Sequence, residues 1–325
     1  MIETNENYTT SERIVLGRTS LNISPLGIGT WQWGDKLFWR YGTGEFNDAD
    51  IQAGFQRALA AGINFFDTAE GYGSGHSETL LGKYLHRAIQ EGKAPKDGLI
   101  IATKFMPYPW RLSRQELILA LKQSLKRLGL DRIDLYQIHQ PIPPRSPEAW
   151  AEALADAVEQ KLVRAVGVSN YSEDWMRRAY DVLARRGVPL ASNQVEYSLL
   201  NRDPEWNGVM KACKELNVTL IAYSPLGKGL LTGKYTQQNP PKGIRRFLLR
   251  QQLSRLQPLV DLLRHIGDNH YGKTPGQVAL NWLMAKGAVP IPGIKTFHHA
   301  EENSGALGWH LTRDEIDQLN DYKFD

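Results

Sequence analysis

Residues 64–73 read Asn-Phe-Phe-Asp-Thr-Ala-Glu-Gly-Tyr-Gly. The apolar run at residues 63–66 predicts a buried strand, and Asp67 stands at its carboxyl end. A glycine-flanked loop carrying Tyr72 follows, and Ser77 is predicted to cap a helix that begins one residue later. A carboxylate beside an apolar strand is costly to desolvate, so it needs a partner or a chemical task. An Asp that only caps a turn is the alternative.

The same arrangement, a short apolar strand followed by a helix, recurs along the chain. Strands are predicted at residues 26–29, 63–66, 99–103, 135–138, 165–168, 193–195, 219–222 and 288–291. Helices are predicted at residues 48–60, 78–90, 114–128, 147–160, 173–186, 205–216, 275–286, 298–307 and 313–320. Strands that are apolar throughout are typical of a parallel sheet covered on both faces. Residues 13–23 alternate around a glycine and predict a small hairpin before the first strand.

Two α/β architectures fit this pattern, a doubly wound sheet and a closed barrel. The glycine fingerprint of a dinucleotide-binding sheet is incomplete, because Gly27 and Gly29 follow the first strand but Gln32 holds the third position. Residues 229–234 are one residue short of a phosphate-binding loop. We therefore predict an α/β fold of the (β/α)₈ TIM-barrel type with an N-terminal hairpin. It forms one domain over residues 1–325, with its core at about 13–320.

Two loops are long for a compact domain, residues 31–47 and residues 237–253. Loops of this length are usually lids or binding walls. The first holds several aromatic side chains, which indicates either the wall of an apolar pocket or packing over the barrel mouth.

Composition excludes several classes of function. The net charge is +4 and charges of both signs are interspersed, so no basic stripe points to nucleic acid. Cys213 is the single cysteine, which leaves no disulfide framework, and the adjacent pair His298 and His299 is weak support for a metal site. No apolar run reaches the roughly 20 residues that span a bilayer. The polar start is unlike a targeting peptide. We expect a cytoplasmic protein, a monomer or a weak homo-oligomer.

Polar residues interrupt the apolar strands at their carboxyl ends, where the active sites of such barrels lie. One of them alone would be an ordinary buried group, but their recurrence at one rim predicts an active site. They are Asp67, Lys104, His139, Ser169, Asn170, Gln194, Tyr223 and Ser224.

Asp67, Tyr72, Lys104 and His139 suit the donation of a proton to a carbonyl oxygen while hydride reaches the carbon. Tyrosine has an ordinary pKa of about 10, and a neighbouring ammonium favours its phenolate. Asp67 can pair with Lys104, and His139 can hydrogen-bond the substrate oxygen. None of the four is a source of hydride, so we expect a nicotinamide cofactor.

From about residue 16 to residue 309 the chain resembles the aldo-keto reductases, NADPH-dependent (β/α)₈ oxidoreductases. Residues 67–73 resemble the signature of that family, with Lys104 in Ala-Thr-Lys and His139 in Tyr-Gln-Ile-His at its other catalytic positions. Within this family, the sequence is more similar to the bacterial, plant and fungal branches, including the pyridoxal reductase-like proteins, than to animal aldose reductases. The resemblance implies that Tyr72 donates the proton, Lys104 tunes it, Asp67 supports Lys104 and His139 orients the carbonyl.

The resemblance also implies NADPH or NADP⁺ as the cofactor. Ser169, Asn170 and Gln194 would hold the carboxamide, Tyr223 would stack on the ring, and Lys295 would pair with the 2′-phosphate, which NAD lacks. The full implied contact set is Gly29, Thr30, Trp31, Asp67, Ser169, Asn170, Gln194, Tyr223, Ser224, Pro225, Leu226, Gly227, Lys228, Gly229, Lys234, Gly293, Lys295, Thr296, His299, Glu302 and Asn303.

The substrate is expected to be a medium-sized aldehyde or ketone held by aromatic or apolar walls, with pyridoxal as a reasonable test compound. The predicted pocket residues are Trp31, Trp33, Tyr72, Tyr108, Trp110 and His139.

Three other functions account for part of this pattern. An aldolase could use Lys104 as a Schiff-base nucleophile, but that leaves Tyr72 without a role. A glycosidase would need a carboxylate pair where His139 and Tyr223 stand. An NADPH-binding, redox-sensing regulatory subunit with slow turnover, as in the β subunits of potassium channels, retains the same four residues and stays open.

Overall fold

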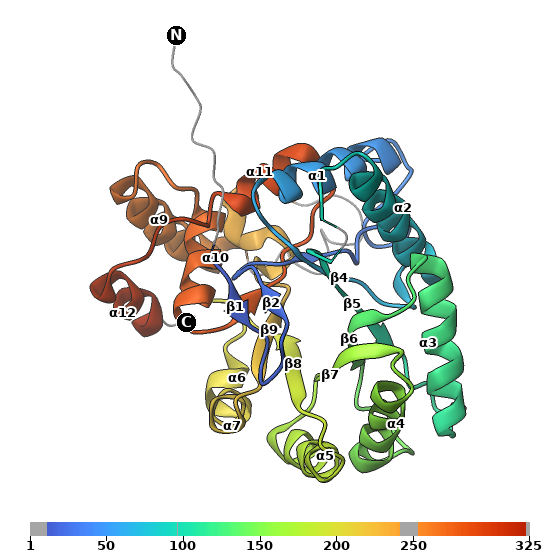
Figure 1. The fold of residues 1–325 in the computed structure, drawn as a ribbon. Coiled ribbons are helices and arrows are strands. Elements are labelled where there is room, and N and C mark those ends of the chain that lie inside the picture. The colour runs from blue at the N-terminus through green and yellow to red at the C-terminus, as the bar shows by residue number, and fades with distance from the viewer. Residues whose placement is uncertain (1–11, 96, 241–252, 323–325) are drawn as a thin grey trace.

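The computed structural model describes residues 12–95, 97–240 and 253–322 (Figure 1). Its central sheet contains eight strands that are all parallel and that neighbour one another in chain order. The strands are β3 (Ile28–Gly29), β4 (Phe65–Asp67), β5 (Ile100–Phe105), β6 (Ile133–Ile138), β7 (Val163–Ser169), β8 (Leu190–Glu196), β9 (Thr219–Tyr223) and β10 (Val289–Pro290).

The first and last strands meet, so the sheet closes into a barrel. The Gly27 N–H donates to Pro290 O at 3.0 Å and the Gly29 N–H donates to Pro292 O at 3.1 Å. Gly29 also forms a parallel bridge with Gly293. A Cβ atom on Gly29 would lie only 2.8 Å from Ile291 O, so this close approach depends on glycine. The predicted (β/α)₈ barrel is confirmed.

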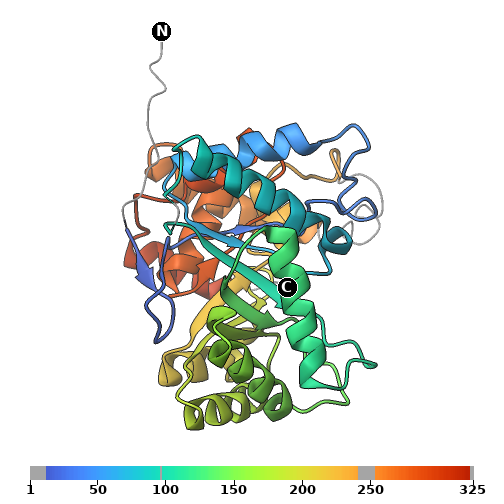
Figure 2. The ribbon, with the colours of Figure 1, turned by 45° about the vertical axis from the view of Figure 1, so that its right-hand side comes forward.

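Helices follow the strands and cover the outside of the barrel, and Figure 2 shows α2 and α3 side by side along its wall. Several helices begin with the side-chain caps that the sequence provides, among them the capping boxes of Asn47 with Asp50 and Ser113 with Glu116. The helices that separate successive strands are α1 (Asp48–Ala60), α2 (His76–Gln90), α3 (Arg114–Leu128), α4 (Pro147–Glu159), α5 (Glu173–Arg185), α6 (Asp203–Trp206), α7 (Val209–Leu216), α9 (Leu253–Asn269) and α10 (Pro275–Ala285). Two more follow β10, α11 (Phe297–Ser304) and α12 (Arg313–Asp321).

The predicted N-terminal hairpin is confirmed and closes the amino-terminal end of the barrel. Its strands, β1 (Ile14–Val15) and β2 (Asn22–Ile23), are antiparallel. Between them, Leu16 and Leu21 are buried in the apolar cluster that fills the barrel interior. The Gly17 N–H donates to Thr219 Oγ1 at 2.8 Å, at the start of β9. The hairpin therefore covers the end of the barrel opposite the carboxyl ends of the strands.

Ser77 does not cap helix α2, contrary to the prediction. The helix begins at His76, and its N-cap is Gly75 with φ of 89°. The buried Ser77 Oγ instead lies 2.7 Å from Thr30 Oγ1 and 2.9 Å from Thr68 Oγ1. Ser77 therefore ties the segments that follow β3 and β4 to one helix.

Two helical segments differ from the prediction. The helix predicted at residues 205–216 is two helices, α6 and α7, because Gly208 takes φ of 84° between them. Helix α9 has no predicted counterpart, and most of the loop predicted at residues 237–253 lies outside the described residues. Over the described ranges, no helix is long and apolar enough to cross a membrane.

Candidate active site

Tyr72 lies on a tight turn at the carboxyl end of β4. It opens a short 3₁₀ segment, η1 (Tyr72–Gly75), in which Gly73 and Ser74 have φ of 54° and 56°. A Cβ atom on Gly73 would lie 2.9 Å from the carbonyl carbon of Gly34, so the loop after β3 packs directly on this turn. The glycines of the motif therefore permit the close packing that fixes Tyr72.

Lys104, on β5, is fully buried and has three oxygen partners at the barrel mouth. Its Nζ donates to Asp67 Oδ1, to Thr68 O at 2.9 Å and to the Tyr72 hydroxyl at 3.4 Å. Burial opposes the charge on Lys104, but Asp67 and Tyr72 outweigh that effect and raise its pKa above the ordinary value. Lys104 is therefore an ammonium at neutral pH.

The second oxygen of Asp67 is also satisfied. Oδ2 accepts hydrogen bonds from Gln137 Nε2 at 3.0 Å and from Gln194 Nε2 at 2.9 Å. Gln194 thus contacts Asp67 in addition to any role toward a cofactor. Gln137 is missing from the sequence prediction, although residues two apart on a strand share a face and His139 lies two residues further on. These bonds leave the buried carboxylate fully partnered, as a stable buried ion pair requires.

The Tyr72 side chain is half-buried, and its desolvation raises its pKa above 10.0. The charge of Lys104 lowers the pKa, as the sequence predicts, but does not cancel the effect of burial. The hydroxyl therefore keeps its proton at neutral pH, which a proton donor must do.

His139 lies edge-on to Tyr72, with ring centroids 5.6 Å apart and an interplanar angle of 77°. Burial and the charge of Lys104 lower the pKa of His139 to about 3. Its Nδ1 is buried without a hydrogen-bond partner among the described residues. A neutral imidazole therefore stands beside Tyr72.

A chain of polar groups continues along the strand ends. Ser169 Oγ donates to Gln194 O at 2.8 Å, and the Tyr223 hydroxyl donates to Asn170 Oδ1 at 3.0 Å. Asn170 Nδ2 donates to Ser169 Oγ at 3.1 Å and to His139 O at 3.2 Å. Asn170 and Ser224 have φ of 60° and 51°, a strained conformation typical of binding sites.

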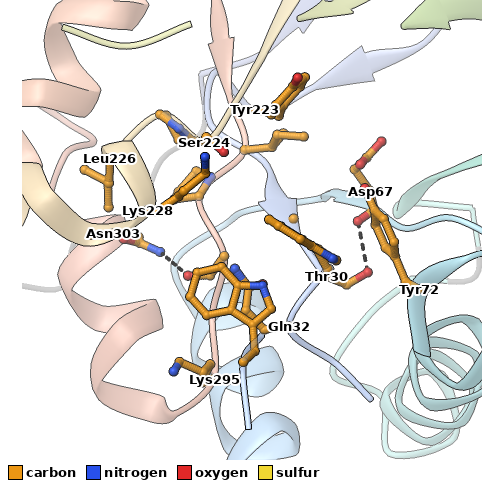
Figure 3. Close-up of a pocket in the computed structure, with 18 of the residues that line it drawn as sticks. Thr30, Gln32, Asp67, Tyr72, Tyr223, Ser224, Leu226, Lys228, Lys295 and Asn303 are labelled. Carbon is orange, nitrogen blue, oxygen red and sulfur yellow. Dashed lines mark hydrogen bonds between the residues drawn. The ribbon is translucent and has the colours of Figure 1, made fainter. Parts of the chain in front are cut away.

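These groups line a cavity of about 870 Å³ at the barrel mouth (Figure 3). Figure 3 shows Asp67 and Tyr72 on one side of it and Lys228, Lys295 and Asn303 on the other. The predicted residues that line it are Gly29, Thr30, Trp31, Asp67, Tyr72, Tyr108, His139, Ser169, Asn170, Gln194, Tyr223, Ser224, Pro225, Leu226, Lys228, Gly229, Lys234, Gly293, Lys295, His299, Glu302 and Asn303. Lining residues without a prediction include Gln32, Trp39, Met106, Gln140, Gln277 and His298.

Five predicted site residues lie outside the cavity wall, and one of them is the fully buried Lys104. Trp33 is fully buried and donates from Nε1 to Ile294 O at 2.9 Å, so it is a core residue. Trp110 is 70% exposed and stacks on Tyr108 from outside. Gly227 is not in the lining, and Thr296 caps helix α11 by accepting from the His299 N–H at 3.3 Å. Sequence spacing does not show which of several nearby aromatic side chains faces the cavity.

The end of the cavity away from Tyr72 is rich in basic groups. Lys228, Lys234 and Lys295 all line it. Lys295 Nζ lies 5.3 Å from the ring centroid of Trp39 and 4.9 Å from that of Phe46, in cation–π geometry. Such a group of cations suits phosphate oxygens.

Among residues 12–95, 97–240 and 253–322, no three histidine, cysteine, aspartate or glutamate side chains are grouped to hold a metal ion.

Comparison with known proteins agrees with this architecture. The model of the Aldo/keto reductase family matches residues 25–323. Pyridoxal reductase of Arabidopsis thaliana, a chloroplastic protein, is 46% identical over 92% of this chain and 83% of its own. An aldo-keto reductase of Schizosaccharomyces pombe whose name includes NADP(+) is 35% identical, covering 83% of this chain and 81% of its own.

Solved structures give the same result. A thermostable aldo-keto reductase in complex with the inhibitor epalrestat is 32% identical with a TM-score of 0.76, covering 95% of this chain and 98% of its own. A glycerol dehydrogenase from Gluconobacter oxydans is 26% identical with a TM-score of 0.81, covering 96% of this chain and 95% of its own. The chain belongs to the aldo/keto reductase family and is an oxidoreductase.

Proposed function

We propose that this protein reduces aldehydes or ketones to alcohols with NADPH, and that Tyr72 donates the proton. The observation that carries the proposal is the buried group at the barrel mouth, in which Lys104 Nζ lies 3.4 Å from the Tyr72 hydroxyl and pairs with Asp67. A protonated phenol beside a fixed ammonium can release its proton to a carbonyl oxygen without leaving an uncompensated negative charge.

The cavity fits a dinucleotide cofactor. Gln32 Oε1 is buried without a partner in the described structure, and Lys228, Lys234 and Lys295 line the far end. We infer that Lys295 meets the 2′-phosphate and that Ser169 and Asn170 meet the carboxamide. Bound NADPH supplies the hydride.

Each of the three residues near Tyr72 then has one task. Lys104 stabilises the phenolate that remains after proton transfer, and Asp67 keeps Lys104 charged and oriented. His139 is a neutral hydrogen-bonding group that orients the carbonyl oxygen. The raised pKa of Lys104 argues against the aldolase alternative, because an ammonium has no lone pair with which to form a Schiff base.

We propose flat aromatic aldehydes, with pyridoxal as the first candidate, as substrates. One relative at 46% identity is named a pyridoxal reductase. The substrate side of the cavity is lined by Trp31, Met106 and Tyr108, which provide apolar and aromatic contacts. We propose that the protein is cytoplasmic. The relative at 46% identity is named as chloroplastic, and that location is stated of the relative alone.

The direct test is oxidation of NADPH by purified protein with pyridoxal, 4-nitrobenzaldehyde and methylglyoxal, followed at about 340 nm, where reduced nicotinamide absorbs. We expect turnover with the aromatic compounds and a clear preference for NADPH over NADH that Lys295→Ala abolishes. Tight NADPH binding without turnover of any aldehyde would contradict the proposal and favour a regulatory subunit.

A further inference from the structure

We propose that Arg111 and Glu70 form a clamp that fixes the aromatic wall of the cavity and thereby makes it selective for flat aromatic aldehydes. This inference rests on the proposed function, since it concerns the class of carbonyl compound that the same cavity takes. Neither residue lines the cavity, and both act through Met106 and Tyr108, which do line it. They are therefore positioning residues.

Glu70 lies between β4 and Tyr72 and reaches across to the loop that follows β5. Its Oε1 accepts a hydrogen bond from the Met106 N–H at 2.8 Å and one from Arg111 Nη1. Its backbone N–H donates to Lys104 O at 3.3 Å. Glu70 therefore holds the loop after β5 to the segment that carries Tyr72.

Arg111 completes the clamp from the other side of the loop. Nη1 also donates to Met106 O at 3.0 Å, and Nη2 donates to Glu70 Oε2 at 3.4 Å. The guanidinium carbon lies 4.9 Å from the ring centroid of Phe105 and 5.3 Å from that of Tyr108. The side chains of Arg111 and Glu70 are only 23% and 11% exposed, so these contacts are weakly screened by water.

The clamp leaves Tyr108 little freedom. The Tyr108 N–H donates to Met106 O at 2.9 Å, and the Arg111 N–H donates to Tyr108 O at 2.8 Å. Trp110 stacks on the Tyr108 ring, with centroids 4.8 Å apart and planes 4° from parallel. A flat aromatic ring gains from a fixed aromatic wall, whereas a small aliphatic aldehyde has no ring to place against it.

The test is Arg111→Met, which keeps an apolar stem and removes the charge and the hydrogen bonds. We expect the ratio of kcat/KM for 4-nitrobenzaldehyde to that for methylglyoxal to fall about tenfold, mainly through KM for the aromatic compound. The Kd for NADPH should stay within about twofold. Amide hydrogen exchange in a peptide covering residues 105–112 should become faster. Arg111→Lys should give an intermediate result, because lysine keeps the charge without the planar fork.

The matched control is Arg114→Met, three residues further on. Arg114 pairs with Glu152 and Asp156 at 3.7 and 3.6 Å on the outside of the barrel and should leave both readouts unchanged. An unchanged selectivity ratio in a folded Arg111→Met protein would overturn the clamp. If the wild type reduces neither aldehyde, the proposed function fails, but amide hydrogen exchange still tests the clamp. An exchange rate at residues 105–112 that is the same in Arg111→Met as in the wild type would overturn it.

Discussion

The buried pair of Asp67 and Lys104 illustrates how single residues determine this site. Each charge alone would be strongly destabilising in a barrel interior, and each is stable because the other is present. Gln137 and Gln194 complete the hydrogen bonds of the carboxylate. The result is an ammonium held at 3.4 Å from the Tyr72 hydroxyl, in a place where water screens little.

His139 should make stability depend on pH. Its pKa is lowered from 6.5 to about 3, so between these values the unfolded chain binds a proton that the folded protein does not. The free energy of unfolding should therefore fall as pH falls from about 6.5 toward 3, by at most about 1.4 kcal/mol per pH unit from this group.

Denaturant titrations of the wild type and His139→Asn between about pH 4.5 and 7.5 would measure this effect as a difference. Asparagine does not titrate, so the wild type should lose stability relative to the variant on acidification. Parallel curves would show that His139 has an ordinary pKa in the folded state.

For single residues, the sequence predicts which polar residues lie at the strand ends. It predicts less well in which direction a side chain on a loop points. Asp67, Lys104 and His139 interrupt apolar strands, and that interruption is visible in the sequence. Trp31 lies in the cavity wall and Trp33 lies in the core. This difference depends on the conformation of an irregular loop, which the spacing of apolar residues in the sequence does not predict.

Among the elements, the loop after β3 connects the two ends of the cavity. Trp31 stacks on Phe38 at 5.3 Å and meets Trp39 edge-on at 5.5 Å. Asp35 Oδ1 accepts the N–H groups of Phe38 and Trp39 at 2.7 and 3.1 Å, which folds the loop. The cavity wall at Trp31 is thus continuous with the aromatic rings around Lys295.

This arrangement predicts that Phe46, which does not line the cavity, influences the choice of cofactor. Phe46→Leu keeps the apolar volume and removes the aromatic face under Lys295. The cation–π interaction that positions the Lys295 ammonium is then lost, which costs about 1 kcal/mol of its interaction with a bound phosphate. The Kd for NADPH should rise about fivefold while the Kd for NADH stays unchanged. Fluorescence titration of both cofactors measures this.

Phe297→Leu is the control, since Phe297 is 48% exposed and faces Arg57 at 6.0 Å. An equal loss of affinity for NADPH and NADH in Phe46→Leu would mean that the phenyl ring shapes the loop and does not position Lys295.

Element types follow from the sequence because apolar strands and capped helices alternate, and α1 and α3 begin and end at the predicted residues. The break between α6 and α7 was not predictable from periodicity, because the apolar pattern continues across Gly208. Helix α9 carries Pro258 inside it, a residue that usually marks the first turn or an interruption of a helix.

On the scale of the whole molecule, the two ends of the barrel have separate tasks. The hairpin β1–β2 closes the amino-terminal end, and the cavity lies at the carboxyl-terminal end. Stability and activity should therefore respond to different substitutions.

Leu21→Ala tests this separation. Leu21 is 1% exposed within the barrel-interior cluster, so truncation should reduce the free energy of unfolding by about 2–5 kcal/mol. Chemical denaturation measures the loss, and kcat/KM of the folded variant should match the wild type. Val15→Ala, at a residue that is 55% exposed, is the control. A folded Leu21→Ala protein with lowered kcat would show that the two ends are coupled.

The most direct test of the central claim is the rate of NADPH-dependent reduction of 4-nitrobenzaldehyde by Tyr72→Phe, measured beside the Kd for NADPH. Phenylalanine keeps the ring next to His139 and removes the hydroxyl near Lys104. We expect kcat to fall at least about a hundredfold with little change in cofactor affinity. A kcat within about tenfold of the wild type would mean that the proton comes from another group.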